Sequence, residues 1–154
     1  MRYLSILVFC FILVSCDSSR VYEDFNDMDE AFWHLDSVQT FTFDIPDSSK
    51  SYNILATFRN ASSYPFYNLY FQYTLLDSTG GILKQQLKEV ELFDSKTGAP
   101  RGSGLGDLFD HSFVLEENYT FDYSGNYSMS LEQYMRRDTL PFILSIGARV
   151  EFAQ

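Results

Sequence analysis

The sequence predicts an all-β domain, and two observations support this. Aromatic residues make up 18% of the 154-residue chain, and almost all of them are Tyr and Phe, which favour sheets over helices. In several segments apolar and polar residues alternate with a period of two, as in half-buried strands. Turn residues separate these segments, and a chain of this length forms one core. We therefore expect a single β-sandwich with a jelly-roll-like strand order, or an immunoglobulin-like order as the alternative.

Residues 1–15 are predicted to be a cleaved secretory signal peptide. Arg2 precedes an apolar run over residues 3–14, and Leu-Val-Ser-Cys follows at positions 13–16. Twelve residues rise only about 18 Å as a helix, which is too short to cross a hydrocarbon core of about 30 Å. The Leu-Val-Ser-Cys motif resembles the bacterial lipobox, in which the cysteine is lipidated and becomes the new N-terminus. Cys10 is discarded with the signal peptide, so Cys16 is the only cysteine left and we expect it to be lipidated.

Residues 16–36 are predicted to form the lipidated N-terminus and a short acidic tether. This segment is polar and acidic, with isolated apolar residues. At its end we expect Phe32, Trp33 and Leu35 to pack on the domain, since a lone Trp beside an acidic linker more often covers a core than binds a ligand. The β-sandwich domain then spans residues 37–154.

The two clearest strands are predicted over residues 52–59 and 67–75. Between them, residues 60–63 are turn-forming, and Pro65 lacks a backbone donor, so the ladder must pause there. We expect these strands to pair as a hairpin on which the rest of the fold is organised. The same alternation predicts five further strands: residues 40–45, 82–93, 107–115, 126–135 and 142–152.

Two connections between these strands are distinctive. Residues 77–81 carry the turn sequence Asp-Ser-Thr-Gly-Gly, so residues 82–93 should return as a hairpin, with a bulge between Leu87 and Val90 where the alternation is poor. Residues 94–106 contain four glycines and a proline, which predicts a long bent loop.

Charge and side-chain chemistry exclude several functions. The chain has 21 acidic and 11 basic side chains, and its formal charge of -10 repels nucleic acid. His34 and His111 have no second histidine or cysteine at ligand spacing, so we expect no catalytic residues, no metal site and no cofactor. Calcium binding at Asp44 with Asp47, or Asp107 with Asp110, is a weaker alternative to a solvated face.

The mature chain carries an ordered set of motifs. They are Cys-Asp at 16–17, Arg-Val-Tyr at 20–22, Trp33 before the first predicted strand, Tyr-Asn-Ile at 52–54, Arg-Asn at 59–60, Tyr-Pro at 64–65, Asn-Leu-Tyr at 68–70, Glu-Gln-x-Met-Arg at 132–136, Ile-Gly at 146–147 and Arg-Val-Glu at 149–151. Together these motifs resemble the GldH gliding-motility lipoproteins of Bacteroidetes. The resemblance covers essentially the whole mature chain, and the Gly-rich loop departs from it at Pro100 and Arg101. It implies an envelope lipoprotein that is needed for surface gliding, is associated with type IX secretion and has no known enzymatic activity.

We therefore expect a non-enzymatic accessory or assembly factor of the gliding and type IX secretion apparatus. Its acyl chains would hold it in the outer membrane, facing the periplasm because residues 17–20 lack an acidic export cluster. The alternative is a glycan- or peptidoglycan-binding module that uses face aromatics such as Tyr70. Interaction residues tend to lie on loops held by a rigid sheet, and the loop residues shared with the family are the candidate protein contacts: Tyr64, Pro65, Asn68, Arg136, Arg137 and Asp138.

Overall fold

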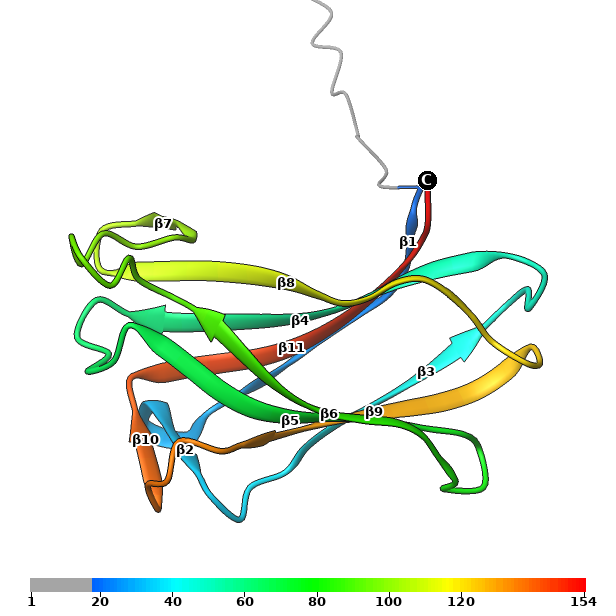
Figure 1. The fold of residues 1–154 in the computed structure, drawn as a ribbon, viewed down its shortest axis with the longest axis horizontal. Coiled ribbons are helices and arrows are strands. Elements are labelled where there is room, and N and C mark those ends of the chain that lie inside the picture. The colour runs from blue at the N-terminus through cyan, green and yellow to red at the C-terminus, as the bar shows by residue number, and fades with distance from the viewer. Residues whose placement is uncertain (1–17) are drawn as a thin grey trace, which may run out of the picture.

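The computed structural model describes residues 18–154, and they form an antiparallel β-sandwich (Figure 1). The all-β prediction is confirmed, because the helical structure in these residues is limited to the short 3-10 turn η1 (Asp29–Ala31). No helix in this part of the chain is long and apolar enough to cross a membrane. The strands are β1 (Arg20–Asp27), β2 (Phe32–His34), β3 (Gln39–Ile45), β4 (Ser51–Ala61), β5 (Asn68–Leu76), β6 (Ile82–Glu91), β7 (Ser103–Leu105), β8 (Leu108–Thr120), β9 (Gly125–Gln133), β10 (Thr139–Pro141) and β11 (Ile143–Phe152).

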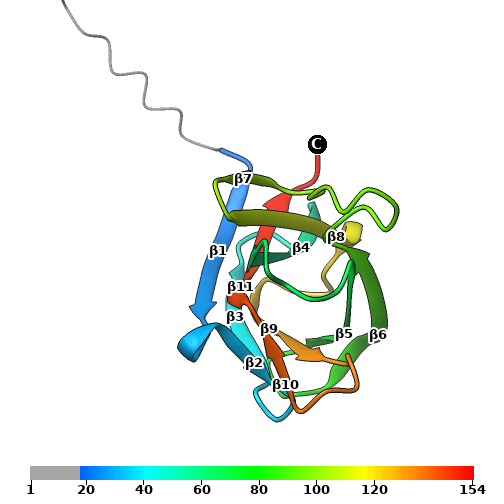
Figure 2. The same ribbon diagram turned by 90° about the vertical axis from the view of Figure 1, so that its left-hand side faces the viewer.

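Two main sheets face each other across the core (Figure 2). One has the order β1-β11-β4-β8-β7, and the other has the order β3-β9-β5-β6. A small third sheet joins β10 to β2 at one end of the sandwich. Each of the two main sheets therefore buries one face and leaves the other to the surroundings.

The strand order is that of a jelly roll, as the sequence predicted. The chain crosses to the opposite sheet at each step from β3 to β4 to β5. It does so again at each step from β6 to β8, from β8 to β9 and from β9 to β11. Within residues 18–154, only β5 and β6 are consecutive long strands that pair as a hairpin. Repeated crossing between two sheets of four long strands is the jelly-roll pattern.

The predicted hairpin between residues 52–59 and 67–75 is wrong. These segments form β4 and β5 as expected, but the two strands lie in different sheets and face each other across the core. Phe58 of β4 packs on Phe71 of β5 with ring centroids 5.0 Å apart. Alternation predicts which face of a strand is buried, but it does not distinguish pairing within a sheet from packing between sheets.

The predicted tether over residues 16–36 is wrong for residues 20–34. Residues 20–27 form β1, an edge strand that pairs with β11 from Arg20 opposite Glu151 to Asp27 opposite Ser145. All of its side chains are exposed or half-buried, which explains why the segment has the composition of a solvated linker. Of the three residues predicted to pack on the domain, Trp33 does cover the core, since it is fully buried and its Nε1 donates to the Ser37 carbonyl at 2.8 Å. Phe32 and Leu35 are exposed instead.

Two irregular features also differ from the prediction. The register between β5 and β6 is regular at Leu87 and Val90, and the shift lies instead between Leu75 and Leu76, beside the turn. The predicted Gly-rich loop contains a short strand, β7, which pairs with the start of β8. Each difference involves a backbone irregularity of one to three residues, which side-chain patterns constrain weakly.

The buried faces follow the predicted alternation. Phe41, Phe43 and Ile45 of β3 are buried while the intervening residues are exposed, and β4, β5, β9 and β11 keep the same period in most of their length. The result is one aromatic core between the two main sheets. Its largest fully buried side chains are Trp33, Tyr52, Tyr73, Tyr127, Phe41, Phe58, Phe71, Ile45, Ile54, Leu69, Leu75 and Leu92.

Candidate functional site

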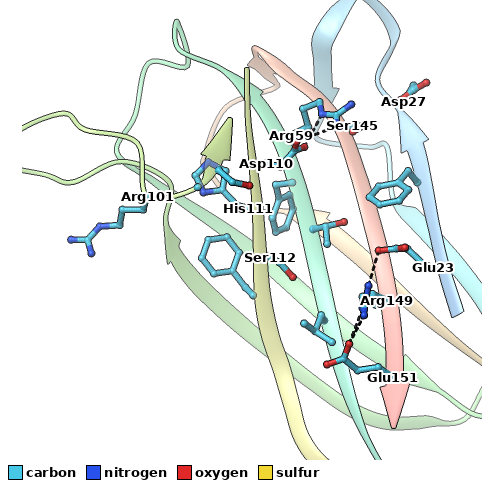
Figure 3. Close-up of a pocket in the computed structure, with 17 residues that line it drawn as sticks. Glu23, Asp27, Arg59, Arg101, Asp110, His111, Ser112, Ser145, Arg149 and Glu151 are labelled. Carbon is cyan, nitrogen blue, oxygen red and sulfur yellow. Dashed lines mark hydrogen bonds and ion pairs between the residues drawn. The ribbon is translucent and has the colours of Figure 1, made fainter. Parts of the chain in front are cut away.

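A hollow of about 830 Å³ lies on the outer face of the β1-β11-β4-β8-β7 sheet and extends along β8 to the loop that carries Arg101 (Figure 3). Three rows of residues, each running across the strands, shape it. The middle row forms the floor, and the two outer rows form charged rims. We call this feature the hollow and define it by these rows: Phe25, Gly147, Thr57 and Ser112 in the floor, Glu23, Arg149 and Leu55 in one rim, and Asp27, Ser145, Arg59 and Asp110 in the other.

Between Phe25 and Ser112 the floor is low because Gly147 and Thr57 are small. Phe25 lies opposite Gly147, Gly147 opposite Thr57, and Thr57 opposite Ser112. A Cβ atom at Gly147 would lie 2.4 Å from Thr57 Oγ1 and 2.5 Å from Phe25 Cδ1, so only glycine leaves room for both side chains. The Phe25 ring is 51% exposed, whereas Thr57 Oγ1 is buried and has no hydrogen-bond partner.

Each rim is held by ion pairs. In one, Arg149 lies 3.4 Å from Glu23 and 2.8 Å from Glu151. In the other, Arg59 donates from Nε and Nη2 to the two carboxylate oxygens of Asp110, at 2.7 and 3.1 Å. This bidentate hydrogen bond raises the pKa of the Arg59 guanidinium. The rims therefore present fixed, paired charges rather than a field of one sign.

His111 lies on the opposite side of β8 from Asp110 and Ser112, beneath the loop that carries Arg101 (Figure 3). Its side chain is 4% exposed, its ring stacks on Phe113 at 6.0 Å, and its Nε2 has no hydrogen-bond partner. Burial lowers the pKa of this imidazole, so the neutral form is favoured. A Cβ atom at Gly102 would lie 2.8 Å from the ring, which shows how closely the loop covers it.

The other ionisable candidates are dispersed. His34 is exposed on β2, and its Nδ1 lies 3.1 Å from Thr139 Oγ1. Within residues 18–154 there is no group of three or more His, Cys, Asp or Glu side chains able to hold a metal ion. The hollow itself is lined by aromatic, hydroxyl, guanidinium and carboxylate side chains.

The predicted contact segments 64–68 and 136–138 do come together. The Arg137 guanidinium lies over the Phe66 ring at 5.7 Å, and Asn68 and Arg136 line one shallow depression. The side chains at this junction that are exposed or half-buried form a surface distinct from the hollow. We call it the loop surface: Pro65, Phe66, Tyr67, Arg136, Arg137 and Asp138.

Two of the predicted contact residues are buried instead. Tyr64 is 5% exposed, its hydroxyl donates to the Asn68 carbonyl at 2.9 Å, and burial raises its pKa. Asn68 is 9% exposed and donates from Nδ2 to Glu89 at 2.7 Å. These side chains hold the connection between β4 and β5 in place and support the exposed Pro65. The predicted lipidation residue, Cys16, lies outside the described residues.

The loop surface lies at the end of the sandwich opposite the start of β1 (Figure 1). Ser19, next to that start, accepts a hydrogen bond from the Phe152 amide, so the chain enters the domain beside its C-terminal strand. At the other end Ala61 donates to the Phe142 carbonyl, where the loops of residues 61–68 and 134–142 meet. The eight residues of β1 separate the two ends by roughly 25 Å.

The hollow was not predicted from the sequence. Its floor consists of residues that are unremarkable one by one, and only the register of four strands places them in a row. The available pattern was weak: Thr57 and Gly147 are small residues in the middle of the polar faces of two strongly alternating strands. A mid-strand glycine often marks a place where another group approaches closely.

Comparison with known proteins identifies the chain's relatives. A family profile described as GldH lipoprotein matches residues 20–150. A gliding motility lipoprotein GldH homolog from Christiangramia forsetii is 31% identical over 96% of this chain and 94% of that protein. The gliding motility lipoprotein GldH of Flavobacterium johnsoniae is 29% identical over 95% of this chain and 93% of that protein.

One solved structure, the infectious bursal disease virus VP2 subviral particle, resembles the chain weakly. Its TM-score is 0.43 at 14% sequence identity, over 98% of this chain and 37% of that one. The sequence relatives are far more informative, because they extend over nearly all of both chains. The predicted family is thereby confirmed: the chain belongs to the GldH lipoprotein family.

Proposed function

We propose that this protein is a non-enzymatic accessory or assembly factor of the gliding motility and type IX secretion apparatus. Family membership over residues 20–150 supports a role in gliding motility. Binding rather than catalysis agrees with the side-chain arrangement, since Arg59 and Arg149 are held by neighbouring carboxylates and His111 is covered by the loop above it. A hydrolase needs a nucleophile and a base within hydrogen-bond reach of each other.

The observation that carries the proposal is the placement of the loop surface relative to the chain entry. A lipid anchor at Cys16 would hold the start of β1 next to the membrane. The loop surface, at the far end of the sandwich, would then point away from that membrane and be free to meet a protein partner. We place the anchor in the outer membrane with the domain in the periplasm.

Deletion and complementation in the native host test this proposal. Cells without the gene should lose colony spreading and secrete less type IX cargo, and the wild-type gene should restore both. The Cys16→Ala variant should accumulate as an unprocessed precursor and restore neither. Normal spreading without the gene would refute the role, and a mature, membrane-bound Cys16→Ala protein would refute the anchor.

The side of the membrane is tested separately. In intact wild-type cells the protein should resist added protease and should be degraded only after the outer membrane is opened. Density-gradient fractions should contain it together with outer-membrane markers. Removal by protease from intact cells would place the domain on the cell surface instead.

A further inference from the structure

The hollow is separate from the loop surface, and the accessory role proposed above does not use it. It combines an exposed aromatic ring at Phe25, an exposed hydroxyl at Ser112 and rim arginines that are paired with carboxylates. We propose that the hollow binds a neutral oligosaccharide. Tyr70, the aromatic residue that the sequence suggested for such a role, lies on the other sheet, where its hydroxyl is hydrogen-bonded to Glu89.

Ser112 provides the accessible hydroxyl at the end of the floor. Its side chain is exposed, lies opposite Thr57 and lines the hollow. The Thr57 hydroxyl beside it is buried, so the contact that a ligand can make is with Ser112. A polyhydroxylated ligand can exchange hydrogen bonds with this hydroxyl group, which both donates and accepts.

The rims favour an uncharged occupant. Arg59 balances Asp110 on one side, and Arg149 and Arg20 together balance Glu23 and Glu151 on the other. Asp27 adds one negative charge, which disfavours an acidic ligand. A guanidinium carries five N–H donors, and Asp110 takes two of those on Arg59, so Arg59 keeps donors for a ligand hydroxyl. The chain's formal charge of -10 also repels an acidic polymer.

Phe25 provides a stacking platform. Its ring is 51% exposed in the hollow and rests against Gly147, whose missing Cβ leaves it room. The C–H face of a pyranose ring is apolar and packs on an aromatic ring while the hydroxyl groups at its edge make hydrogen bonds. The floor crosses four adjacent strands, a length of about 14 Å, which suits a short oligosaccharide lying across the sheet.

An extended polypeptide fits the floor less well. Peptides commonly bind a sheet by adding a strand to a free edge, where main-chain hydrogen bonds provide the affinity. The central strands of the floor, β11 and β4, are each paired on both sides, so their backbone groups are already used. A ligand here must be recognised through side chains.

Calorimetric titration of the full-length protein, in a detergent without sugar groups, tests this inference. The probes are neutral tetrasaccharides of glucose, mannose and N-acetylglucosamine, with tetragalacturonate and a Gly-Ser peptide as the charged and peptide comparisons. At least one neutral tetrasaccharide should bind saturably. Phe25→Ala should weaken its binding about tenfold or more and Ser112→Ala several-fold, without lowering the melting temperature, because both side chains are exposed.

Two substitutions outside the hollow serve as matched controls. Tyr134→Ala removes an aromatic side chain that is 43% exposed near the loop surface, and Thr42→Val removes an exposed hydroxyl on β3. Both should bind like the wild type. The inference is overturned if no neutral tetrasaccharide binds, if the peptide or tetragalacturonate binds more tightly, or if the two hollow variants bind as well as the controls. None of these outcomes depends on gliding or secretion, so the accessory role is tested independently.

Discussion

The loop surface and the hollow are both accessible, but they are built in different ways. The loop surface consists of exposed side chains on two connections, and one ring contact between Arg137 and Phe66 joins them. The hollow consists of side chains from four paired strands, so the sheet register fixes its shape. The loop surface can therefore be changed with little effect on stability, whereas added volume at Gly147 in the floor of the hollow destabilises the sheet.

The largest effect is expected from a substitution in the core, which supports both surfaces. Phe71 is fully buried between the sheets and packs on Phe58. Phe71→Ala should lower the free energy of unfolding by about 3 to 5 kcal/mol, since it removes the ring and leaves a cavity. Urea denaturation followed by circular dichroism measures this. A change below about 1 kcal/mol would show that the core does not depend on this contact.

A methyl group in the floor of the hollow should have the next largest effect. Gly147→Ala places a Cβ atom within 2.8 Å of the Asp24 carbonyl and closer still to Thr57 and Phe25. Overpacking of this kind typically costs about 1 to 3 kcal/mol. Arg137→Ala on the loop surface should cost less than about 1 kcal/mol, because it removes one exposed cation–π contact. Urea denaturation measures both variants. Equal losses in their free energy of unfolding would contradict the expected difference between the hollow and the loop surface.

His111 should make the stability of the domain depend on pH. Burial lowers its pKa in the folded state, so the unfolded chain binds a proton more readily than the folded one. Stability should therefore fall as the pH drops below about 6.5, where the unfolded imidazole becomes charged. His111→Gln should remove this part of the pH dependence while the carboxylates continue to contribute theirs. Identical slopes of stability against pH in the two proteins would be the contrary result.

The smallest effect is expected at the rim of the hollow. Arg59 and Asp110 are both about half exposed, so their ion pair is screened by solvent. A double-mutant cycle with Arg59→Gln and Asp110→Asn should give a coupling energy of about 0.2 to 1 kcal/mol that decreases with added salt. A coupling well above this range would mean that the rim contributes to stability as much as the floor does.

The sequence predicted most of the core and the overall winding of the chain. Alternation of apolar and polar residues predicted the buried faces of residues 40–45, 52–59 and 126–135. A strand with one buried face shows this period of two in its sequence. It did not predict β1, whose side chains are exposed or half-buried on both faces. An edge strand held mainly by backbone hydrogen bonds to β11 leaves little trace in side-chain patterns.

The loop surface and the hollow also differ in how well the sequence predicted them. Motif resemblance selected the loops that form the loop surface, although it did not separate the buried Tyr64 and Asn68 from the exposed Pro65. The hollow depends on which residues of β1, β11, β4 and β8 lie opposite one another. That information is held in strand register, which a single sequence does not contain when the strands are distant along the chain.

The central claim is that the protein acts in gliding through its loop surface and without catalysis. Colony spreading of the deletion strain tests it most directly, after complementation with Arg136→Ala/Arg137→Ala/Asp138→Ala or with His111→Gln, each at matched protein level. The account predicts that the loop variant folds but fails to restore spreading, whereas His111→Gln restores it. A well-folded His111→Gln protein without function, beside a loop variant that spreads normally, would contradict the account and favour an enzyme.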